Sequence, residues 1–390
     1  MKEIKPEDYG LDRFDLLLDP AIHATIYAGR KSLIEQLKRR IDRAFMTGSA
    51  MHTILWGPYG VGKTHTLYYL VNYIKNRGYQ ANLFHLTCPS FTKKSVVELY
   101  QAIIMSFGQK FLFRLIEEVW NIVQPTFREL DARTDADKIE IIDKFISHRD
   151  FSSVILSYQK PSAQMPYLVW KWLSGEKCSA KEKETLGVIT DNSEPANAIH
   201  TLLTIIETNT KIKLQKNDKT MMILMIDELE QLEPLGDAMD FRELFRRLAE
   251  QKRLFVMLLA YTAGSAEQVP VLNAPPVRQR LGFPHNYIAV TAFDPGEAKQ
   301  FIAELFSLLR PKKIDLEKKV EEVSKVTSEK VTSEFYPFTE EAIEALITKI
   351  TASGEALSPR TIEMALTMAL GDALTQKEIP KVITSEIIGL

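Results

Sequence analysis

The segment GPYGVGKT at residues 57–64 limits most strongly what this chain can fold into. It follows the apolar run HTILW at 52–56 and precedes an amphipathic helical pattern, THTLYYLVNYIKNRG at 64–78. Its two outer glycines, its lysine and its threonine occupy every fixed place of the pattern G-x-x-x-x-G-K-[ST], which describes a phosphate loop. A strand, a glycine loop and a helix start suit an anion, because loop N–H groups and the positive end of the helix then face it.

We therefore predict a phosphate site at this loop. Lys63 would reach the terminal phosphates, and the Thr64 hydroxyl would ligate Mg²⁺. The alternative interpretation is an ordinary glycine-rich turn between a strand and a helix. The residues predicted to contact the phosphates are Gly57, Pro58, Tyr59, Gly60, Val61, Gly62, Lys63, Thr64 and His65.

Five short apolar runs of β type are separated by helical patterns. Near-continuous apolar strands that alternate with helices indicate a parallel sheet covered on both faces. We predict an α/β fold with three layers around a five-stranded parallel sheet. The five runs are 52–56, 81–88, 221–227, 254–262 and 286–293.

The distance between the second and third runs is far longer than a single crossover requires. The stretch from about 108 to 217 has helical patterns, and we predict a helical insertion there, in which Trp170 and Trp172 pack rather than stack on bases. After the fifth run only amphipathic helical patterns follow, and the charged stretch 311–334 is typical of a solvated helix. The predicted domains are a nucleotide-binding α/β domain over 1–295 and a helical lid domain over 296–390.

The composition argues against several classes of protein, although nucleic-acid binding through local basic patches is not excluded. Forty-nine basic and 51 acidic residues in a chain of 390 give a formal charge of −2. The chain as a whole therefore lacks the net positive charge that would attract nucleic acid. Cys88 and Cys178 lack the spacing of a zinc site or a disulfide framework, which fits a reducing cytoplasm. No apolar run has the length of a signal core or membrane span, so we expect a soluble, cytoplasmic protein without membrane contact.

A second motif, MMILMIDE at 221–228, ends an apolar run with two acids. Asp227, at the carboxyl end of a strand, would hold Mg²⁺, and Glu228 would orient and deprotonate an attacking water. Together with the glycine loop this motif predicts one shared ligand, Mg·ATP. The alternative for the acids is a surface pair that caps the following helix.

In the order of these motifs the chain resembles the AAA+ ATPases, in particular the initiator-like branch of origin-recognition ATPases and TnsC-type transposition regulators. The segment YAGRKSLIEQL at 27–37 resembles the family's segment ahead of the phosphate loop, which would place Tyr27 and Gly29 beside the adenine. Arg30 would equally suit the start of an amphipathic helix. The resemblance also implies that Thr262, which ends the fourth run, contacts the γ-phosphate or the attacking water.

The resemblance assigns roles to two further arginines. In PPVRQRLGF at 275–283, Arg280 matches the arginine finger that acts on the nucleotide of a neighbouring subunit, with Arg278 as the alternate. This role implies a homo-oligomer. In ALSPRTIEMAL, Arg360 resembles the family's second sensor, which would reach the γ-phosphate from the lid. Surface solvation is the alternative for the finger arginines, and Pro359 suits a first helical turn without any function.

Possible partners follow from two segments. Lys93 and Lys94 in PSFTKKSVVEL oppose the dipole of the helix expected there, so they are DNA-contact candidates, although a solvated helix face is the alternative. Residues 166–188 in the insertion resemble inserts in P-loop ATPases of prokaryotic defence loci of the BREX type.

The predicted function is an ATP-hydrolysing switch or loader, dependent on ATP and Mg²⁺, that oligomerises and acts on DNA or a DNA-bound protein. The alternative is a signalling or scaffold ATPase of the defence type, which acts on a protein partner without binding DNA directly. A small-molecule kinase is disfavoured, because the paired arginine motifs and the lid resemble a self-assembling ATPase.

Overall fold

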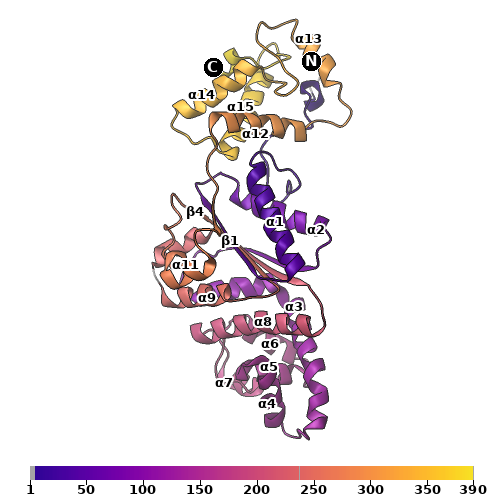
Figure 1. The fold of residues 1–390 in the computed structure, drawn as a ribbon, viewed down its shortest axis with the longest axis vertical. Coiled ribbons are helices and arrows are strands. Elements are labelled where there is room, and N and C mark those ends of the chain that lie inside the picture. The colour runs from indigo at the N-terminus through magenta and orange to yellow at the C-terminus, as the bar shows by residue number, and fades with distance from the viewer. Residues whose placement is uncertain (1–4, 237, 390) are drawn as a thin grey trace. The chain divides into compact units, whose positions relative to one another are not determined.

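The computed structural model describes residues 5–236 and 238–389. The strands of this part of the chain form a five-stranded sheet in the order β2-β3-β4-β1-β5 (Figure 1). The predicted α/β class with a parallel five-stranded sheet is confirmed. The strands are β1 (Met51–Gly57), β2 (Ala81–Thr87), β3 (Met221–Asp227), β4 (Phe255–Thr262) and β5 (Tyr287–Ala289).

Helices account for most of the remaining chain. The α-helices are α1 (Lys31–Thr47), α2 (Lys63–Asn76), α3 (Val96–Glu129), α4 (Asp135–Ile146), α5 (Arg149–Tyr158), α6 (Met165–Leu173), α7 (Ala180–Leu186), α8 (Pro195–Gln215), α9 (Met239–Ala249), α10 (Pro270–Asn273), α11 (Pro275–Leu281), α12 (Pro295–Leu308), α13 (Leu316–Val323), α14 (Glu340–Ala352), α15 (Pro359–Thr375) and α16 (Ser385–Gly389). Two short 3₁₀ helices are η1 (Pro6–Tyr9) and η2 (Leu229–Leu235).

β3 is the most deeply buried strand, and every one of its residues is buried. A continuous apolar sequence is what a strand needs when it has neighbours along both edges and cover on both faces. β2 and β4 run parallel to it, with Thr87 opposite Asp227 and Leu259 opposite Ile226. β3 therefore ends with the buried Asp227 at the carboxyl end of the sheet, where the Cys88 N–H donates to the Asp227 carbonyl at 2.8 Å.

β5 is shorter than the run predicted for it, 286–293, because it ends at Ala289. The Val290 carbonyl still lies against Gly57, the last residue of β1, but the Phe293 N–H already donates to the Leu357 carbonyl at 2.8 Å. These partners are distant in sequence. The chain therefore leaves the sheet although its apolar pattern continues.

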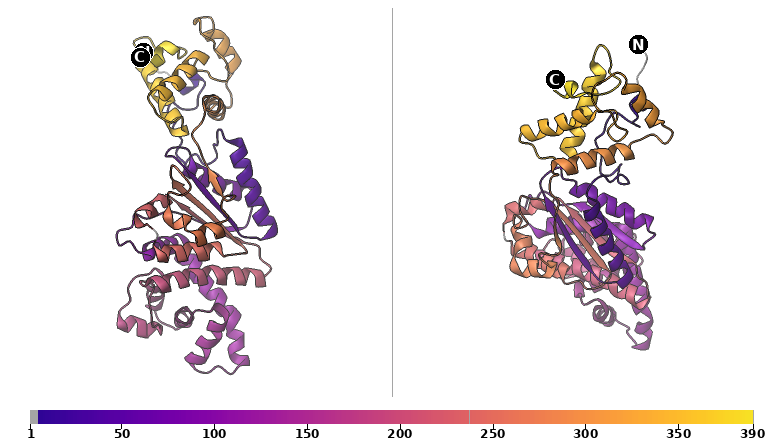
Figure 2. Two further views of the ribbon diagram at one scale, coloured as in Figure 1. Left: turned by 60° about the vertical axis from the view of Figure 1, so that its left-hand side comes forward. Right: turned by 45° about the horizontal axis from the view of Figure 1, so that its top comes forward.

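The stretch between β2 and β3 is helical, from α3 to α8, and Figure 2 shows these helices grouped together. α3 bends at Gly108, whose φ of 73° is not helical, and this bend lies at the start of the expected insertion. Trp172 is fully buried, and its indole N–H donates to the Thr190 carbonyl at 3.0 Å, so it packs as expected. The insertion bounds, about 108–217, stay a prediction.

The C-terminal region contains α12 to α16, and the N-terminal segment packs with them. Leu11 and Leu16 are fully buried in the same apolar cluster as α12, α14 and α15. The N–H of Leu16 donates to Thr367 Oγ1 at 3.0 Å, and that of Leu18 donates to Glu363 Oε2 at 3.1 Å. Of the charged stretch 311–334, only α13 is helical, since the residues after it are rich in Val, Thr and Ser, which favour helices weakly.

The chain divides into two compact units. We call Met1–Arg39, Gly57–Asn76 and Ala289–Leu390 the loop–lid unit, and Arg40–Trp56 and Arg77–Ile288 the sheet unit. The predicted domains, 1–295 and 296–390, stay a prediction. In the residues that the structure describes, no helix is long and apolar enough to cross a membrane.

Glu363 on α15 gives the loop–lid unit a pH-dependent stability. Its side chain is buried, and burial raises the pKa of its carboxyl from 4.5 to about 8. The folded protein therefore keeps a proton that the unfolded chain loses near pH 4.5. The stability contributed by this protonation is complete below pH 4.5 and is lost as the pH rises through about 8.

We expect Glu363→Gln to stabilise the protein at pH 8 by on the order of 3 kcal/mol, because glutamine stays neutral and can still accept the hydrogen bond from Leu18. Denaturant unfolding of variant and wild type at pH 5 and pH 8 measures this gain, which should shrink towards the lower pH. Glu355→Gln, at an exposed position, is the matched control. Equal gains at both pH values would contradict the assignment.

Candidate functional site

The glycine loop joins β1 to α2, and at two of its positions neighbouring atoms leave no room for a side chain. A Cβ at residue 57 would lie 2.0 Å from the carbonyl oxygen of Val290. Gly60 has a φ of +79°, and a Cβ there would lie 2.9 Å from Ser358 Oγ. Glycine is required at both positions for the loop to follow this path.

Lys63 is the first residue of α2 and is buried against the loop. Its ammonium group donates to the carbonyl oxygens of Gly57 at 2.9 Å and Pro58 at 2.8 Å. The cation is thus held by the loop's own backbone. This is the place that a phosphate loop gives to its lysine.

The first turns of α2 also hold Tyr27. Thr66 Oγ1 donates to the Gly62 carbonyl at 2.8 Å and lies 3.1 Å from the Tyr27 hydroxyl, while the Tyr27 ring centroid is 4.7 Å from that of Tyr69. Burial raises the pKa of Tyr27, so this hydroxyl keeps its proton. Within the described part of the chain, the Thr64 hydroxyl makes no hydrogen bond, which leaves it available to a metal ion.

The side chain of His65 is turned towards the N-terminal segment, and the predicted contact of this residue with phosphate stays a prediction. Its Nε2 lies 2.6 Å from the Ile26 carbonyl, and burial lowers the pKa of the ring. A neutral ring that donates through Nε2 explains this contact. Three residues further on, the Gly29 N–H donates to Glu304 Oε2 at 2.8 Å, so α2 and α12 hold the N-terminal segment in place.

Arg30 precedes α1 and does not behave as the solvated first residue of a helix. Its guanidinium donates to the Val61 carbonyl at 2.8 Å and also to the Thr291 carbonyl, and it stacks on Phe293 with 4.2 Å between Cζ and the ring centroid. Burial lowers its pKa. Arg30 therefore connects the glycine loop to the segment that leads into α12. The sequence does not predict this role, because its partners Val61 and Thr291 are distant from it in the chain.

The structure brings Arg360 to the glycine loop. Its backbone nitrogen lies 3.5 Å from the Gly60 carbonyl oxygen, and its guanidinium lies 5.4 Å from the centroid of the Tyr59 ring. Ser358 caps α15 at this point, since its Oγ accepts from the Thr361 N–H at 3.2 Å. The start of α15 and the loop are therefore neighbours within the loop–lid unit.

The sheet unit brings the predicted acids and the predicted threonine together. Asp227 is buried, and its Oδ1 accepts from the Glu228 N–H at 2.9 Å. Glu228 has a left-handed φ of 57° and an exposed side chain, and partial desolvation with the charges of Asp227 and Glu230 raises its pKa. Glu230 Oε2 accepts from the Thr262 N–H at 2.8 Å. Glu230 is not among the predicted site residues, although it is the third acid of the segment D-E-L-E.

α11 carries both candidate finger arginines, which differ in their surroundings. Arg278 stacks on Phe283 at 3.3 Å from the ring centroid and donates to Asn273 Oδ1 at 3.1 Å. Arg280 forms an ion pair of 2.5 Å with Glu250, and 38% of its side chain is exposed. Arg278 is thus part of the local packing, whereas Arg280 is held by a surface carboxylate.

Lys93 and Lys94 lie in an exposed loop directly before α3, whose N-cap is Ser95. The Glu98 carboxylate closes this loop by accepting from the N–H groups of Lys93 at 3.0 Å and Thr92 at 2.9 Å. Among the described residues, neither lysine has an ion-pair partner. The two cations are therefore presented to solvent by a loop whose backbone is fixed.

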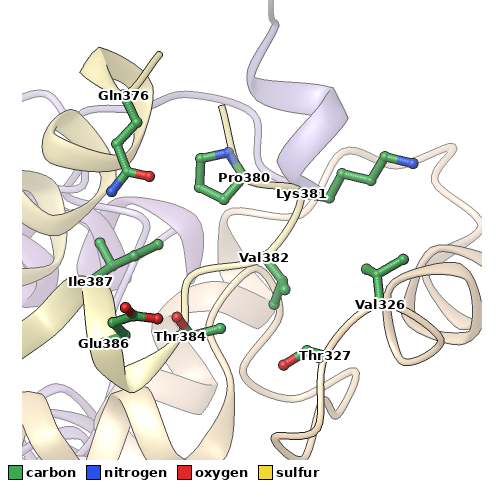
Figure 3. Close-up of a pocket in the computed structure, with 9 residues that line it drawn as sticks. All are labelled: Val326, Thr327, Gln376, Pro380, Lys381, Val382, Thr384, Glu386 and Ile387. Carbon is green, nitrogen blue, oxygen red and sulfur yellow. The ribbon is translucent and has the colours of Figure 1, made fainter. Parts of the chain in front are cut away.

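A pocket of about 540 Å³ lies in the C-terminal region (Figure 3). None of the predicted site residues lines it, so it is separate from the glycine loop. Its lining residues are Val326, Thr327, Gln376, Pro380, Lys381, Val382, Thr384, Glu386 and Ile387.

The predicted residues are thus gathered in two groups. The loop–lid unit brings together the glycine loop, Lys63, Tyr27 and Arg360, and the sheet unit brings together Asp227, Glu228 and Thr262. That Asp227 shares a ligand with Lys63 stays a prediction, as do the individual roles.

No protein-family model matches this chain. No curated protein matches it either. Among solved structures, it is similar to ORC1 of Aeropyrum pernix in complex with DNA (TM-score 0.48, 11% identity, 96% of this chain and 67% of that chain). It is also similar to Drosophila ORC bound to DNA, with a TM-score of 0.49 and 10% identity over 98% of this chain and 63% of that chain. A third similar structure is Cdc6p of Pyrobaculum aerophilum, with a TM-score of 0.42 and 13% identity over 94% of this chain and 68% of that chain. The chain spans about two thirds of the length of these proteins.

The chain is thus structurally similar to ORC/Cdc6 initiator AAA+ ATPases over nearly its whole length, at low sequence identity. The likeness of its insertion to ATPases of defence loci stays a prediction.

Proposed function

We propose that this protein binds and hydrolyses Mg·ATP as an AAA+ switch or loader that oligomerises and acts on DNA or a DNA-bound protein. One observation carries the proposal: within one compact unit, the buried ammonium of Lys63 lies inside a glycine loop that also contacts the start of α15 at Arg360. Two cations and a row of loop N–H groups at one place suit a polyphosphate.

The remaining roles follow from the chemistry of the side chains. Thr64 and Asp227 offer the hard oxygen ligands that Mg²⁺ takes beside phosphate and water, and the Thr64 hydroxyl has no other hydrogen bond within the described residues. When bound, Mg²⁺ neutralises charge on the phosphates. Glu228 deprotonates the attacking water, which its raised pKa favours because the carboxylate is then a stronger base. Thr262 contacts the γ-phosphate or that water, and Tyr27 lies beside the adenine.

The sheet supports this assignment. Strands β1, β3 and β4 belong to one parallel sheet, and ligands of such sheets bind outside the carboxyl ends of the strands. β1 leads into the glycine loop, β3 ends at Asp227, and β4 ends at Thr262.

We expect Lys63→Ala to lose nucleotide binding, because it removes the cation inside the loop. Glu228→Gln should keep nucleotide affinity and lose turnover by about 10²-fold or more, because glutamine cannot accept the proton of water. Calorimetric titration with ATP and measurement of phosphate release test both variants. Lys75→Ala, at the exposed far end of α2, should retain both properties.

Normal turnover by Glu228→Gln would remove this residue as the base. Undiminished ATP affinity of Lys63→Ala would remove the proposed nucleotide site.

We further propose that Arg280 acts on the nucleotide of a neighbouring subunit. Arg280→Ala should reduce turnover by about 10³-fold, the lower end of the effect of such fingers. A mixture with Glu228→Gln should regain turnover, because subunits with an intact Arg280 then adjoin subunits with an intact Glu228. Phosphate release by each variant alone and by the mixture measures this effect.

Arg246→Ala is the matched control, since Arg246 shares the Glu250 carboxylate with Arg280 and should be dispensable for turnover. A mixture that stays as inactive as its components would contradict action between subunits.

DNA binding is proposed through Lys93 and Lys94, whose ammonium groups are exposed. Replacing both with alanine should weaken binding to duplex DNA and make the slope of log affinity against log salt concentration shallower by about 2. Fluorescence anisotropy over a salt series measures this slope. Lys312 and Lys313, another exposed lysine pair, provide the control double variant.

Unchanged DNA affinity of the Lys93 and Lys94 variant would exclude this surface. A wild-type protein whose ATP turnover does not respond to DNA, and which binds none, would favour the signalling or scaffold alternative.

A further inference from the structure

We infer that Glu230 is a positioning residue that fixes the end of β4, at Thr262, to the segment that carries Glu228. The inference rests on the proposed ATP hydrolysis, because it assigns the role of holding two of the reacting-site residues in one arrangement. It concerns only residues of the sheet unit.

The need for Glu230 follows from the unequal lengths of two neighbouring strands. β3 pairs with β4 up to Ile226 opposite Leu259, and β3 ends one residue later at Asp227. β4 continues to Thr262. The backbone of Thr262 therefore lies beyond the pairing with β3, and its N–H group needs another acceptor.

The Glu230 side chain supplies this acceptor. Its Oε2 lies 2.8 Å from the Thr262 nitrogen, which is a normal length for a hydrogen bond from a backbone N–H to a carboxylate. Such a charge-assisted bond is stronger than one between neutral groups. The carboxylate thus replaces the strand pairing that β3 no longer provides.

The segment between Glu228 and Glu230 links the backbone of Glu228 to the end of β4. Glu228 is fixed on one side by the bond from its N–H to Asp227 Oδ1, and it is followed directly by η2. η2 is anchored by Leu229 and Leu232, both fully buried. With Glu230 bound to Thr262, the backbone that carries Glu228 and the end of β4 form one connected piece.

Loss of this attachment should affect turnover more than nucleotide binding. A misplacement of about 1 Å at reacting groups costs on the order of 10²-fold in rate. The proposed phosphate contacts of the glycine loop do not involve Glu230. We therefore expect a lower kcat at an unchanged nucleotide affinity.

The test compares Glu230→Leu, which removes the acceptor, with Glu230→Gln, which keeps an oxygen that can accept from the Thr262 N–H. Glu233→Leu is the matched control, since Glu233 lies on the same short helix, is exposed and pairs with Gln268 instead of with β4. For each protein we would measure kcat, the dissociation constant of ATP, and amide hydrogen exchange of the peptide that contains Thr262.

We expect Glu230→Leu to lower kcat by about 10-fold or more, to keep the ATP dissociation constant within about 2-fold, and to accelerate exchange at Thr262. Glu230→Gln should retain more of kcat and of the protection at Thr262 than Glu230→Leu, because it keeps the acceptor although it lacks the charge near Glu228, and Glu233→Leu should remain close to wild type in all three measurements. Both variants of Glu230 lack its charge, so the difference between the glutamine and leucine variants measures the effect of the hydrogen bond.

Wild-type kcat in Glu230→Leu, or equal loss in the leucine and glutamine variants, would overturn the inference while leaving ATP hydrolysis intact. Unchanged exchange at Thr262 in Glu230→Leu would overturn it as well. If wild-type protein neither binds nor hydrolyses ATP, the proposed function fails and the positioning role fails with it, whatever the exchange experiment shows.

Discussion

The path of the glycine loop depends on one close approach between two backbone segments. A Cβ at Gly57 would lie 2.0 Å from the Val290 carbonyl oxygen, so the loop reaches this position only without a side chain. Arg30 strengthens the same junction, because it bonds the carbonyls of both Val61 and Thr291. The loop and the segment that leads into α12 are therefore held together by direct contacts. A ligand that shifts the loop would also act on that segment.

The loop has a second attachment, to the start of α15. Gly60 adjoins Ser358, the N-cap of this helix, and its carbonyl faces the backbone nitrogen of Arg360. α15 also holds the N-terminal segment through Glu363, which accepts from the Leu18 N–H. The loop thus contacts elements that are joined to one another by hydrogen bonds and by one apolar cluster. A displacement of the loop would therefore reach several helices by direct contact.

The sequence predicts those features that depend on local pattern, and it fails where distant segments meet. β3 could be predicted to the residue, since burial on both faces demands a continuous apolar run. β5 could not, because after Ala289 the chain turns to partners distant in sequence, such as Leu357, whose carbonyl accepts from the Phe293 N–H. The glycine loop could be located from the sequence, because the spacing of its glycines, lysine and threonine is a local pattern. Glu230 could not be predicted as a site residue, because its carboxylate accepts from the Thr262 N–H only where β4 extends past its pairing with β3.

The two arginines on α11 differ in the contacts that each would lose on binding another group. Arg278 stacks on Phe283 at 3.3 Å, so to act on a neighbouring nucleotide it would have to abandon a packed ring. Arg280 is paired with Glu250, and exposed ion pairs contribute only about 0–1 kcal/mol. Glu250 would keep Arg246 as a partner if Arg280 left. Arg280 can therefore leave its surface carboxylate at little cost, which is why we propose Arg280 rather than Arg278 as the residue that acts between subunits.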